Sequence, residues 1–404
     1  MKTLKISENF WWVGTLDPDL RVFDIVFATE CGTTYNSFLL KGSQKNVLFE
    51  ATKASFTSEY IEALETIIPV SEIDALVLCH TEPDHSGAVE KLLDMNPEIE
   101  IYATIGGLTL TKELVNREFK GITVKDGDEI NIGDCTLRFI IAPNLHWPDT
   151  MFTYIPEKKI LVSCDVFGAH YSYENVIYDE EIDKDAFLKE AKFYFDNIMG
   201  PFCPDVLKGI DKIEGLEIDI IANGHGPVLT TNPRFMVDLY RQWASEPNRN
   251  EKKTVIIPYV SAYGYTKQLA EKIKEGIETA GSIDVKLFDM VYANIEDVMA
   301  EIGKCDGFLL GTPTVVGEAL PPIWNIAGSL NPRIHGGRFA GAFGSYGWSG
   351  EGVPHIMERL KQLKLKLVGD GLRVRFKPNE EEFAGAFEYG KVFGTSVLTD
   401  TLPE

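Results

Sequence analysis

The chain carries His80-Thr81-Glu82-Pro83-Asp84-His85, a stretch that places two imidazoles and two carboxylates within six residues. Residues 73–79 before it are apolar except for Asp74, which is typical of a short buried strand, and a helical pattern begins at Ser86. The motif is therefore expected on a loop between a strand and a helix, which can aim its side chains at one point. Charged groups this dense repel one another unless a cation binds them, so a metal site is predicted. The alternative is an acidic turn whose histidines cap or pair.

Length and charge limit the classes of function. With 404 residues the chain is expected to form two domains. Lys and Arg total 39 against 61 Asp and Glu, a formal net charge of -22, which argues against nucleic-acid or anionic-membrane partners. No run is long enough to span a membrane and the start lacks the apolar core of a signal peptide, so a cytoplasmic location is expected. The six cysteines form no C-x-x-C pair and are expected to be reduced and mostly buried.

Residues 1–250 show short strand patterns interleaved with helical ones, which predicts a layered α/β or α+β domain. Expected strands lie at 10–14, 34–40, 47–50, 137–141, 151–154, 160–163 and 218–222. Expected helices lie at 58–67, 86–95, 107–119 and 184–197. The polar stretch 245–253 lacks periodicity, and we place the domain boundary there, at residue 250.

Residues 251–404 alternate regularly between strand and helix patterns. Expected strands lie at 254–260, 285–290, 307–311, 339–344 and 372–376. Expected helices lie at 267–279, 295–302, 322–330, 353–363 and from 381 onward. Five strands, each followed by a helix, predict a doubly wound parallel sheet.

Further candidate metal ligands follow later strands of the first domain. His146 comes shortly after the strand pattern ending at 141, Asp165 ends the apolar stretch that begins at 160, and His225 follows the one ending at 222. Each lies where a loop could bring it to the motif at 80–85. This recurrence at strand ends strengthens the prediction of a metal site.

The order H-x-E-x-D-H, then His146, Asp165 and His225, resembles the metallo-β-lactamase fold. Its hydrolase members usually carry a third histidine where this chain has Glu82. With that carboxylate, the set is similar to the diiron site of flavodiiron proteins, also called A-type flavoproteins. Mixed imidazole and carboxylate ligation suits iron that cycles between ferrous and ferric. The resemblance implies an αββα sandwich followed by a flavodoxin-like domain.

The same resemblance implies a role for each ligand. One iron is bound by His80, Glu82 and His146, the other by Asp84 and His225, and Asp165 bridges both. Hydrolases use the position of His85 as a ligand, but flavodiiron proteins generally do not, so we expect His85 beside the ligand set. His170 either lines the pocket and donates a proton or hydrogen bond, or is a surface-loop histidine. Phe23 and Glu30 are further candidates near the substrate. Two histidines are expected at the surface: His335 and His355.

Three loops of the second domain are candidates for binding a flavin. The stretch Ser261-Ala262-Tyr263-Gly264-Tyr265-Thr266 lies between a strand and a helix, where backbone N–H groups and the helix dipole favour a phosphate. It resembles the flavodoxin phosphate loop, with Ser261 in place of the more usual threonine or aspartate; a hydroxyl-capped helix is the alternative. The other two loops are Gly311-Thr312-Pro313-Thr314-Val315 and Gly344-Ser345-Tyr346-Gly347-Trp348-Ser349-Gly350.

Both of these loops follow strands, at the carboxyl edge where doubly wound folds bind ligands. Tyr346 or Trp348 could stack on a flat ring. The second loop closely matches the flavodiiron pattern, and FMN is the implied cofactor. Together with His85 and His170, Tyr346 and Trp348 are the candidate catalytic residues.

The resemblance implies reduction of dioxygen to water, or of nitric oxide to nitrous oxide, at the diiron centre, with FMN passing electrons. It also implies a homodimer, or a dimer of dimers. Because no pair of C-x-x-C motifs follows the flavin domain, the electron donor is expected to be separate: rubredoxin, or a reduced deazaflavin coenzyme as in methanogen relatives. Two other readings are a dizinc hydrolase that uses a metal-bound hydroxide and an electron-carrier flavoprotein without metals.

Overall fold

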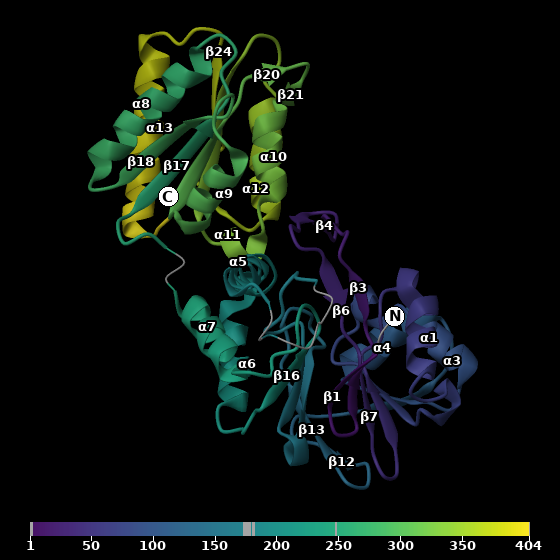
Figure 1. The fold of residues 1–404 in the computed structure, drawn as a ribbon. Coiled ribbons are helices and arrows are strands. Elements are labelled where there is room, and N and C mark those ends of the chain that lie inside the picture. The colour runs from purple at the N-terminus through teal and green to yellow at the C-terminus, as the bar shows by residue number, and fades with distance from the viewer. Residues whose placement is uncertain (1–2, 173–178, 180–181, 247–248, 404) are drawn as a thin grey trace. The chain divides into compact units, whose positions relative to one another are not determined.

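The computed structural model describes residues 3–172, 179, 182–246 and 249–403. The chain divides into two compact units, Met1–Glu246 and Pro247–Glu404. Each unit has its own sheets and its own covering helices (Figure 1).

Two sheets form the centre of the first unit. The larger has seven strands in the order β1-β2-β7-β8-β9-β10-β11, and the smaller has five in the order β12-β13-β14-β15-β16. The larger sheet comprises β1 (Leu4–Ser7), β2 (Phe10–Trp12), β7 (Phe38–Lys41), β8 (Asn46–Phe49), β9 (Ala75–Val77), β10 (Glu100–Ala103) and β11 (Lys120–Thr123). The smaller comprises β12 (Glu129–Asn131), β13 (Thr136–Ile141), β14 (Met151–Ile155), β15 (Ile160–Cys164) and β16 (Ile220–Asn223).

Side-chain alternation along the strands builds three buried layers. In β8, Val47 and Phe49 belong to the cluster shared with the smaller sheet, whereas Leu48 belongs to the cluster under the helices. The larger sheet is covered by α1 (Thr57–Glu65), α3 (Val89–Met95) and α4 (Ile105–Val115). The smaller is covered by α5 (Lys184–Tyr194), α6 (Cys203–Ile213) and α7 (Pro233–Ser245). The predicted αββα sandwich is confirmed (Figure 1).

Short elements complete this unit. Two small hairpins pair β3 (Thr15–Asp17) with β6 (Thr33–Tyr35) and β4 (Val22–Phe23) with β5 (Phe27–Ala28). The 3-10 turns are Ala54–Phe56, Val70–Glu72, Pro156–Lys158 and Gly200–Phe202, and a π-helical turn spans Phe195–Met199.

Two predictions in this unit were wrong in detail. The expected strand 34–40 is two strands, β6 and β7, because Asn36 leaves the ladder: its N–H donates to Gly224 O (2.8 Å) instead. The metal motif was expected wholly on a loop, but Pro83–Ser86 forms a helical turn, α2. Proline favours the first position of a helix because its φ is already helical.

The second unit is built on a parallel sheet in the order β18-β17-β19-β22, followed by β23 and β24, which both pair with β22. In order of sequence this is 2-1-3-4-5, the flavodoxin order. Its strands are β17 (Thr254–Tyr259), β18 (Asp284–Asp289), β19 (Gly307–Gly311), β22 (Phe339–Tyr346), β23 (Lys366–Leu367) and β24 (Leu372–Arg375). The predicted fifth strand thus has a short companion, β23.

Helices cover both faces of this sheet, as its continuous apolar strands require (Figure 1). One face packs on α9 (Ile295–Lys304), α10 (Pro321–Ser329) and α12 (Gly352–Gln362). The other packs on α8 (Tyr265–Ala280) and α13 (Glu380–Thr399). The unit also contains α11 (Pro332–His335) and a small hairpin of β20 (Thr314–Val315) and β21 (Glu318–Ala319).

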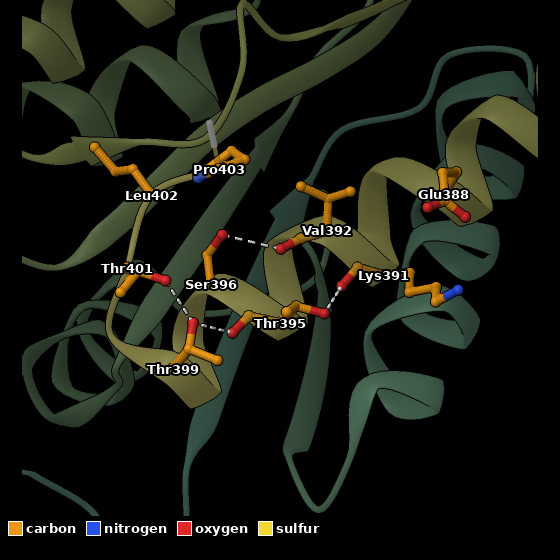
Figure 2. A pocket seen from close by; sticks show the side chains of 9 residues that line it. All are labelled: Glu388, Lys391, Val392, Thr395, Ser396, Thr399, Thr401, Leu402 and Pro403. Atoms are coloured by element: carbon orange, nitrogen blue, oxygen red, sulfur yellow. Dashed lines mark hydrogen bonds between the residues drawn. The ribbon is translucent and has the colours of Figure 1, made fainter.

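A hollow of about 230 Å³ lies between α13 and the residues that follow it (Figure 2). The hydroxyls of Thr395, Ser396 and Thr399 each donate to a carbonyl one turn earlier in α13. These polar groups are satisfied by the helix itself, so the hollow is a feature of packing.

Among the residues that the structure describes, no helix is both long enough and apolar enough to cross a membrane.

The packing of α8 against α13 depends on glycine. A Cβ at Gly390 would lie 2.1 Å from Ile273 O, so Gly390→Ala must push the helices apart. We expect it to lower the free energy of unfolding by about 1–3 kcal/mol. Gly385→Ala, on the same helix with nothing within 4 Å of its Cβ, should be neutral or stabilising by up to about 1 kcal/mol. Calorimetric unfolding of the full chain measures both; equal stability of the two variants would contradict this packing.

Candidate metal centre and flavin loops

The candidate ligands of the first unit come from strand ends in both sheets. His80 and Glu82 follow β9, and Asp84 and His85 lie in α2 just after them. The others follow β13, β15 and β16: His146, Asp165 and His225. The two packed sheets therefore bring together ligands that are far apart in the sequence.

The first group consists of four residues whose ligand atoms lie within 4.8 Å of one another: His80, Glu82, His146 and Asp165. His146 Nε2 lies 3.0 Å from Glu82 Oε2 and 3.0 Å from Asp165 Oδ2. His80 Nε2 lies 3.4 Å and 3.3 Å from the same two oxygens. Two imidazole nitrogens and two carboxylate oxygens thus face one point.

The second group contains Asp84, His85 and His225, again within 4.8 Å. The Nε2 atoms of His85 and His225 lie 3.1 Å apart, and they lie 3.5 Å and 3.3 Å from Asp84 Oδ2. Asp165 Oδ1 lies 2.9 Å from His85 Nε2 and 3.5 Å from His225 Nε2. Asp165 therefore turns one oxygen toward each group.

These residues fit two metal ions. Within the described residues, five buried atoms of the groups have no hydrogen-bond partner: His80 Nε2, both carboxylate oxygens of Asp84, Asp165 Oδ1 and His85 Nδ1. Buried polar atoms are nearly always paired, and unpaired ones are costly, so atoms that face one another in this way are suited to bind cations. Mixed nitrogen and oxygen donors suit iron.

The electrostatics of the site support the same interpretation. Burial alone would raise the pKa of Glu82, but hydrogen bonds from two histidines lower it below its usual value. Burial would lower the pKa of His146, but hydrogen bonds to Asp165 and Glu82 raise it to about 9. The pKa of His85 is also raised to about 9, because neighbouring carboxylates outweigh its burial. Carboxylates and imidazoles therefore hold one another in their charged forms.

The position of His85 differs from the expectation drawn from its sequence. We expected it beside the ligand set, but its Nε2 lies among the ligand atoms of the second group. The sequence could not reveal this, because the helical turn α2 decides which way His85 points.

Neighbouring residues hold the ligands in place. The Asn36 side chain donates to the carbonyls of Asn223 (2.9 Å) and Gly226 (2.8 Å), which fixes the loop that carries His225. Gly224 in that loop must be glycine, because a Cβ there would lie 2.7 Å from Asp165 Oδ1. The ring of His225 is held from behind by a hydrogen bond between its Nδ1 and Thr34 O (2.6 Å).

His170 is buried beside the second group, so its interpretation as a surface-loop histidine was wrong. Its Nδ1 lies 3.0 Å from Thr33 Oγ1, and its ring centroid lies 4.1 Å from that of Phe23 and 5.4 Å from that of His225. Burial and the nearby His225 charge hold its pKa well below the usual value, so its ring is neutral. Phe23 thus lies beside His170 and His225, next to the second ligand group.

The predictions for Glu30, His335 and His355 had different outcomes. Glu30 is exposed and pairs with Lys189 at 2.6 Å. His335, expected at the surface, is buried, and its Nδ1 accepts a hydrogen bond from Asn331 N (3.0 Å) within α11 and its cap. His355 is exposed as expected.

Several residues that contact the ligands, or the loop that carries His225, were not predicted from the sequence. Cys164 Sγ lies 2.8 Å from His80 Nδ1, and Glu50 and Cys164 form a third compact group with His85. One signal was available for Glu50: it is an acidic residue directly after the apolar strand β8, as Asp165 is after β15. Asn36 and Gly224 offered no comparable signal.

The three flavin loops follow β17, β19 and β22, which are neighbours in the sheet, so their carboxyl ends lie together. The loops are joined by a hydrogen bond between the buried hydroxyls of Thr266 and Ser345 (3.0 Å). Ser261 Oγ accepts the N–H of Lys267 in the first turn of α8 (3.2 Å), and Gly264 has a left-handed φ of 85°. The turn therefore needs glycine where it enters the helix.

The other two loops are also internally braced. Thr312 Oγ1 accepts the N–H of Leu320 (3.0 Å), and Thr314 Oγ1 that of Gly352 (3.2 Å). A Cβ at Gly350 would lie 2.8 Å from the ring of Tyr346. Two aromatic rings are largely exposed at this edge, Tyr263 at 86% and Trp348 at 93%, and Val315 is also exposed. The remaining predicted contacts lie in the same loops: Ala262, Tyr265, Pro313 and Gly347. A glycine-rich edge with exposed rings fits a flat flavin.

Comparison with known proteins connects both units to known families. A family described as ODP family beta lactamase matches residues 33–226, and the flavodoxin family matches residues 257–390. Flavo-diiron protein FprA2 of Clostridium acetobutylicum is 40% identical over 98% of this chain and 100% of its own length. A nitric oxide reductase of Moorella thermoacetica is 33% identical over 96% of each chain.

A solved structure extends the likeness. Rubredoxin oxygen:oxidoreductase from the anaerobe Desulfovibrio gigas is 26% identical, with a TM-score of 0.72 over 98% of this chain and 99% of that one. Since likeness of this degree spans the whole chain and both cofactor regions, the protein belongs to the flavodiiron family, the type A flavoproteins, oxidoreductases with a diiron site and FMN.

Proposed function

We propose that the protein reduces dioxygen to water, nitric oxide to nitrous oxide, or both, with electrons that reach the diiron site through FMN. The observation that carries this proposal is the pair of ligand groups that share Asp165, because a small diatomic molecule can meet two metals there. Relatives named for nitric oxide reduction and for oxygen reduction support the two substrates.

Each residue of the metal centre has a role in this proposal. His80, Glu82 and His146 would hold one iron, Asp84 and His225 the other, with Asp165 between them and His85 in position to join the second. When bound, two ferrous ions and a reduced flavin supply the four electrons that full reduction of dioxygen requires. His170 is neutral and its Nε2 is unpaired among the described residues, so it can offer a hydrogen bond beside the second group.

The flavin loops would hold FMN by different means. The stretch 261–266 would bind the phosphate, because it contains the hydroxyl residues Ser261 and Thr266 and leads into the N-terminus of α8, whose backbone N–H groups favour an anion. The loops 312–315 and 345–350 would bind the ring, with Tyr346 or Trp348 against it.

The proposal extends to the electron supply and to the assembly of the protein. The electron donor would be a small redox protein such as rubredoxin, which the name of the Desulfovibrio gigas relative supports, or a reduced deazaflavin coenzyme. We propose a homodimer, or a dimer of dimers, in which the flavin of one subunit serves the irons of the next. Full activity of a monomer in sedimentation at every concentration would contradict this assembly.

The function is tested by mixing the fully reduced protein with each gas under anaerobic stopped flow. Flavin reoxidation should be fast with dioxygen, with nitric oxide or with both, and should leave no peroxide when dioxygen is reduced. Flavin that reoxidises slowly with both gases, or peroxide as the main product, would contradict the proposal.

Asp165→Asn tests the shared carboxylate. The amide keeps the size of the side chain but loses one ligand oxygen and the charge, so both groups are damaged. We expect gas reduction to fall by more than about 100-fold, beyond the usual effect of a residue that only supports a ligand, while FMN stays bound. Asp211→Asn, at an exposed carboxylate paired with Arg241, is the control and should change neither. Unchanged activity in the Asp165 variant would rule out the bridging role.

Metal uptake should depend on pH in a defined direction. Because the pKa of His85 and of His146 is raised to about 9, both imidazoles carry an extra proton at neutral pH in the metal-free protein. A metal binds the neutral ring and must displace those protons. Affinity should therefore rise between pH 7 and pH 9, by about tenfold per pH unit for each proton displaced. Zn²⁺ titration against a chelator at several pH values measures this, with His355→Ala as control; a flat profile would contradict it.

A further inference from the structure

Glu50 is a buried carboxylate behind the metal groups that lies outside the proposed ligand set. It directly follows β8, has a left-handed backbone (φ 58°) and is only 1% exposed. Left-handed backbone is unfavourable for a residue with a long side chain, and burial of a carboxylate is costly. Glu50 combines an unfavourable backbone conformation with a buried carboxylate, which indicates that its side chain has a specific role.

The backbone around Glu50 is tied to both ends of the ligand motif. Glu50 Oε1 accepts the N–H of Cys79 (2.7 Å), the residue directly before His80. The N–H of Ala51 donates to His85 O (2.7 Å). The residues that follow β8 therefore contact both ends of the metal motif, at Cys79 just before His80 and at His85.

Two buried polar atoms in this region are unpaired. Among the described residues, neither Glu50 Oε2 nor His85 Nδ1 has a hydrogen-bond partner. Ligand atoms of Glu50, His85 and Cys164 lie within 4.8 Å of one another. Cys164 Sγ already contacts His80 Nδ1 at 2.8 Å, and His85 Nε2 already faces Asp165 at 2.9 Å. The unpaired oxygen and the unpaired nitrogen therefore belong to residues of one compact buried group, in which they can pair directly or through one bridging water.

We propose that Glu50 is the positioning residue that makes His85 a metal ligand. Its carboxylate accepts the Nδ1–H of His85, which leaves the lone pair of Nε2 directed at the second group. A carboxylate behind a ligating imidazole sets its tautomer and its orientation. Without Glu50, the proton can move to Nε2 and the ring is lost as a ligand. This inference rests on the proposed metal centre.

A purely structural role for Glu50 makes a different prediction. If it served only to accept the N–H of Cys79, glutamine would replace it, because one amide oxygen is enough for that bond. Toward His85, however, glutamine would present an NH₂ group, which cannot accept the Nδ1–H. Glu50→Gln therefore separates the two roles.

The test is a titration of the metal-free full chain with Zn²⁺, in four proteins that form a double-mutant cycle: the wild type, Glu50→Gln, His85→Asn and the double variant. Glu50→Gln should weaken the second Zn²⁺ by about 10–100-fold and leave the first unchanged. In the His85→Asn background it should have no further effect, because Glu50 acts through His85. Glu190→Gln, at a buried carboxylate of α5, is the matched control and should leave both steps unchanged.

Two results would overturn the inference: an unchanged second step in Glu50→Gln, or an equal loss with and without His85. If Glu50→Gln does not fold, NMR of the imidazole nitrogens in the Zn²⁺-loaded wild type decides. A proton on Nδ1 of His85 with metal on Nε2 supports the inference, and a metal-free or Nε2-protonated ring overturns it. Both readouts are independent of gas reduction, so a protein that binds Zn²⁺ as expected but reduces neither gas would contradict only the proposed function.

Discussion

The site depends on one carboxylate that faces two groups of ligands. Asp165 Oδ2 lies 3.0 Å from His146 Nε2, and its Oδ1 lies 2.9 Å from His85 Nε2. Removing this many charged groups from water is costly unless cations join them. The surrounding fold holds them together nonetheless, with Asn36 fixing the His225 loop and Gly224 leaving room for Asp165. This arrangement is that of a preformed site for two metals.

The identity of the metal follows from the donors. A hydrolase of the same fold would have an imidazole where this chain has Glu82, whose oxygen lies 3.0 Å from His146 Nε2. Oxygen donors favour a metal that must reach a higher charge. In the proposed function, the flavodoxin unit supplies electrons to the metals through its FMN. Membership in the flavodiiron family agrees with both features.

Much of this architecture could be predicted from the sequence, because each ligand follows an apolar strand and each flavin loop follows a parallel strand. Such local patterns can be recognised without knowing which distant segments come into contact. What could not be predicted depends on contacts between distant segments. The break between β6 and β7 arises because Asn36 bonds to the loop at 223–226, and the place of His85 depends on a four-residue helical turn. His170 and His335 lie in loop and turn stretches that resemble surface segments, yet both are buried by packing that no local pattern indicates.

The central prediction is that this chain binds two irons at a shared carboxylate and one FMN that supplies their electrons. Its most direct test is the metal and flavin content of the full chain purified without oxygen, by elemental analysis and absorbance. We expect two irons and one FMN per chain. Two zincs per chain, or FMN without metal, would contradict it.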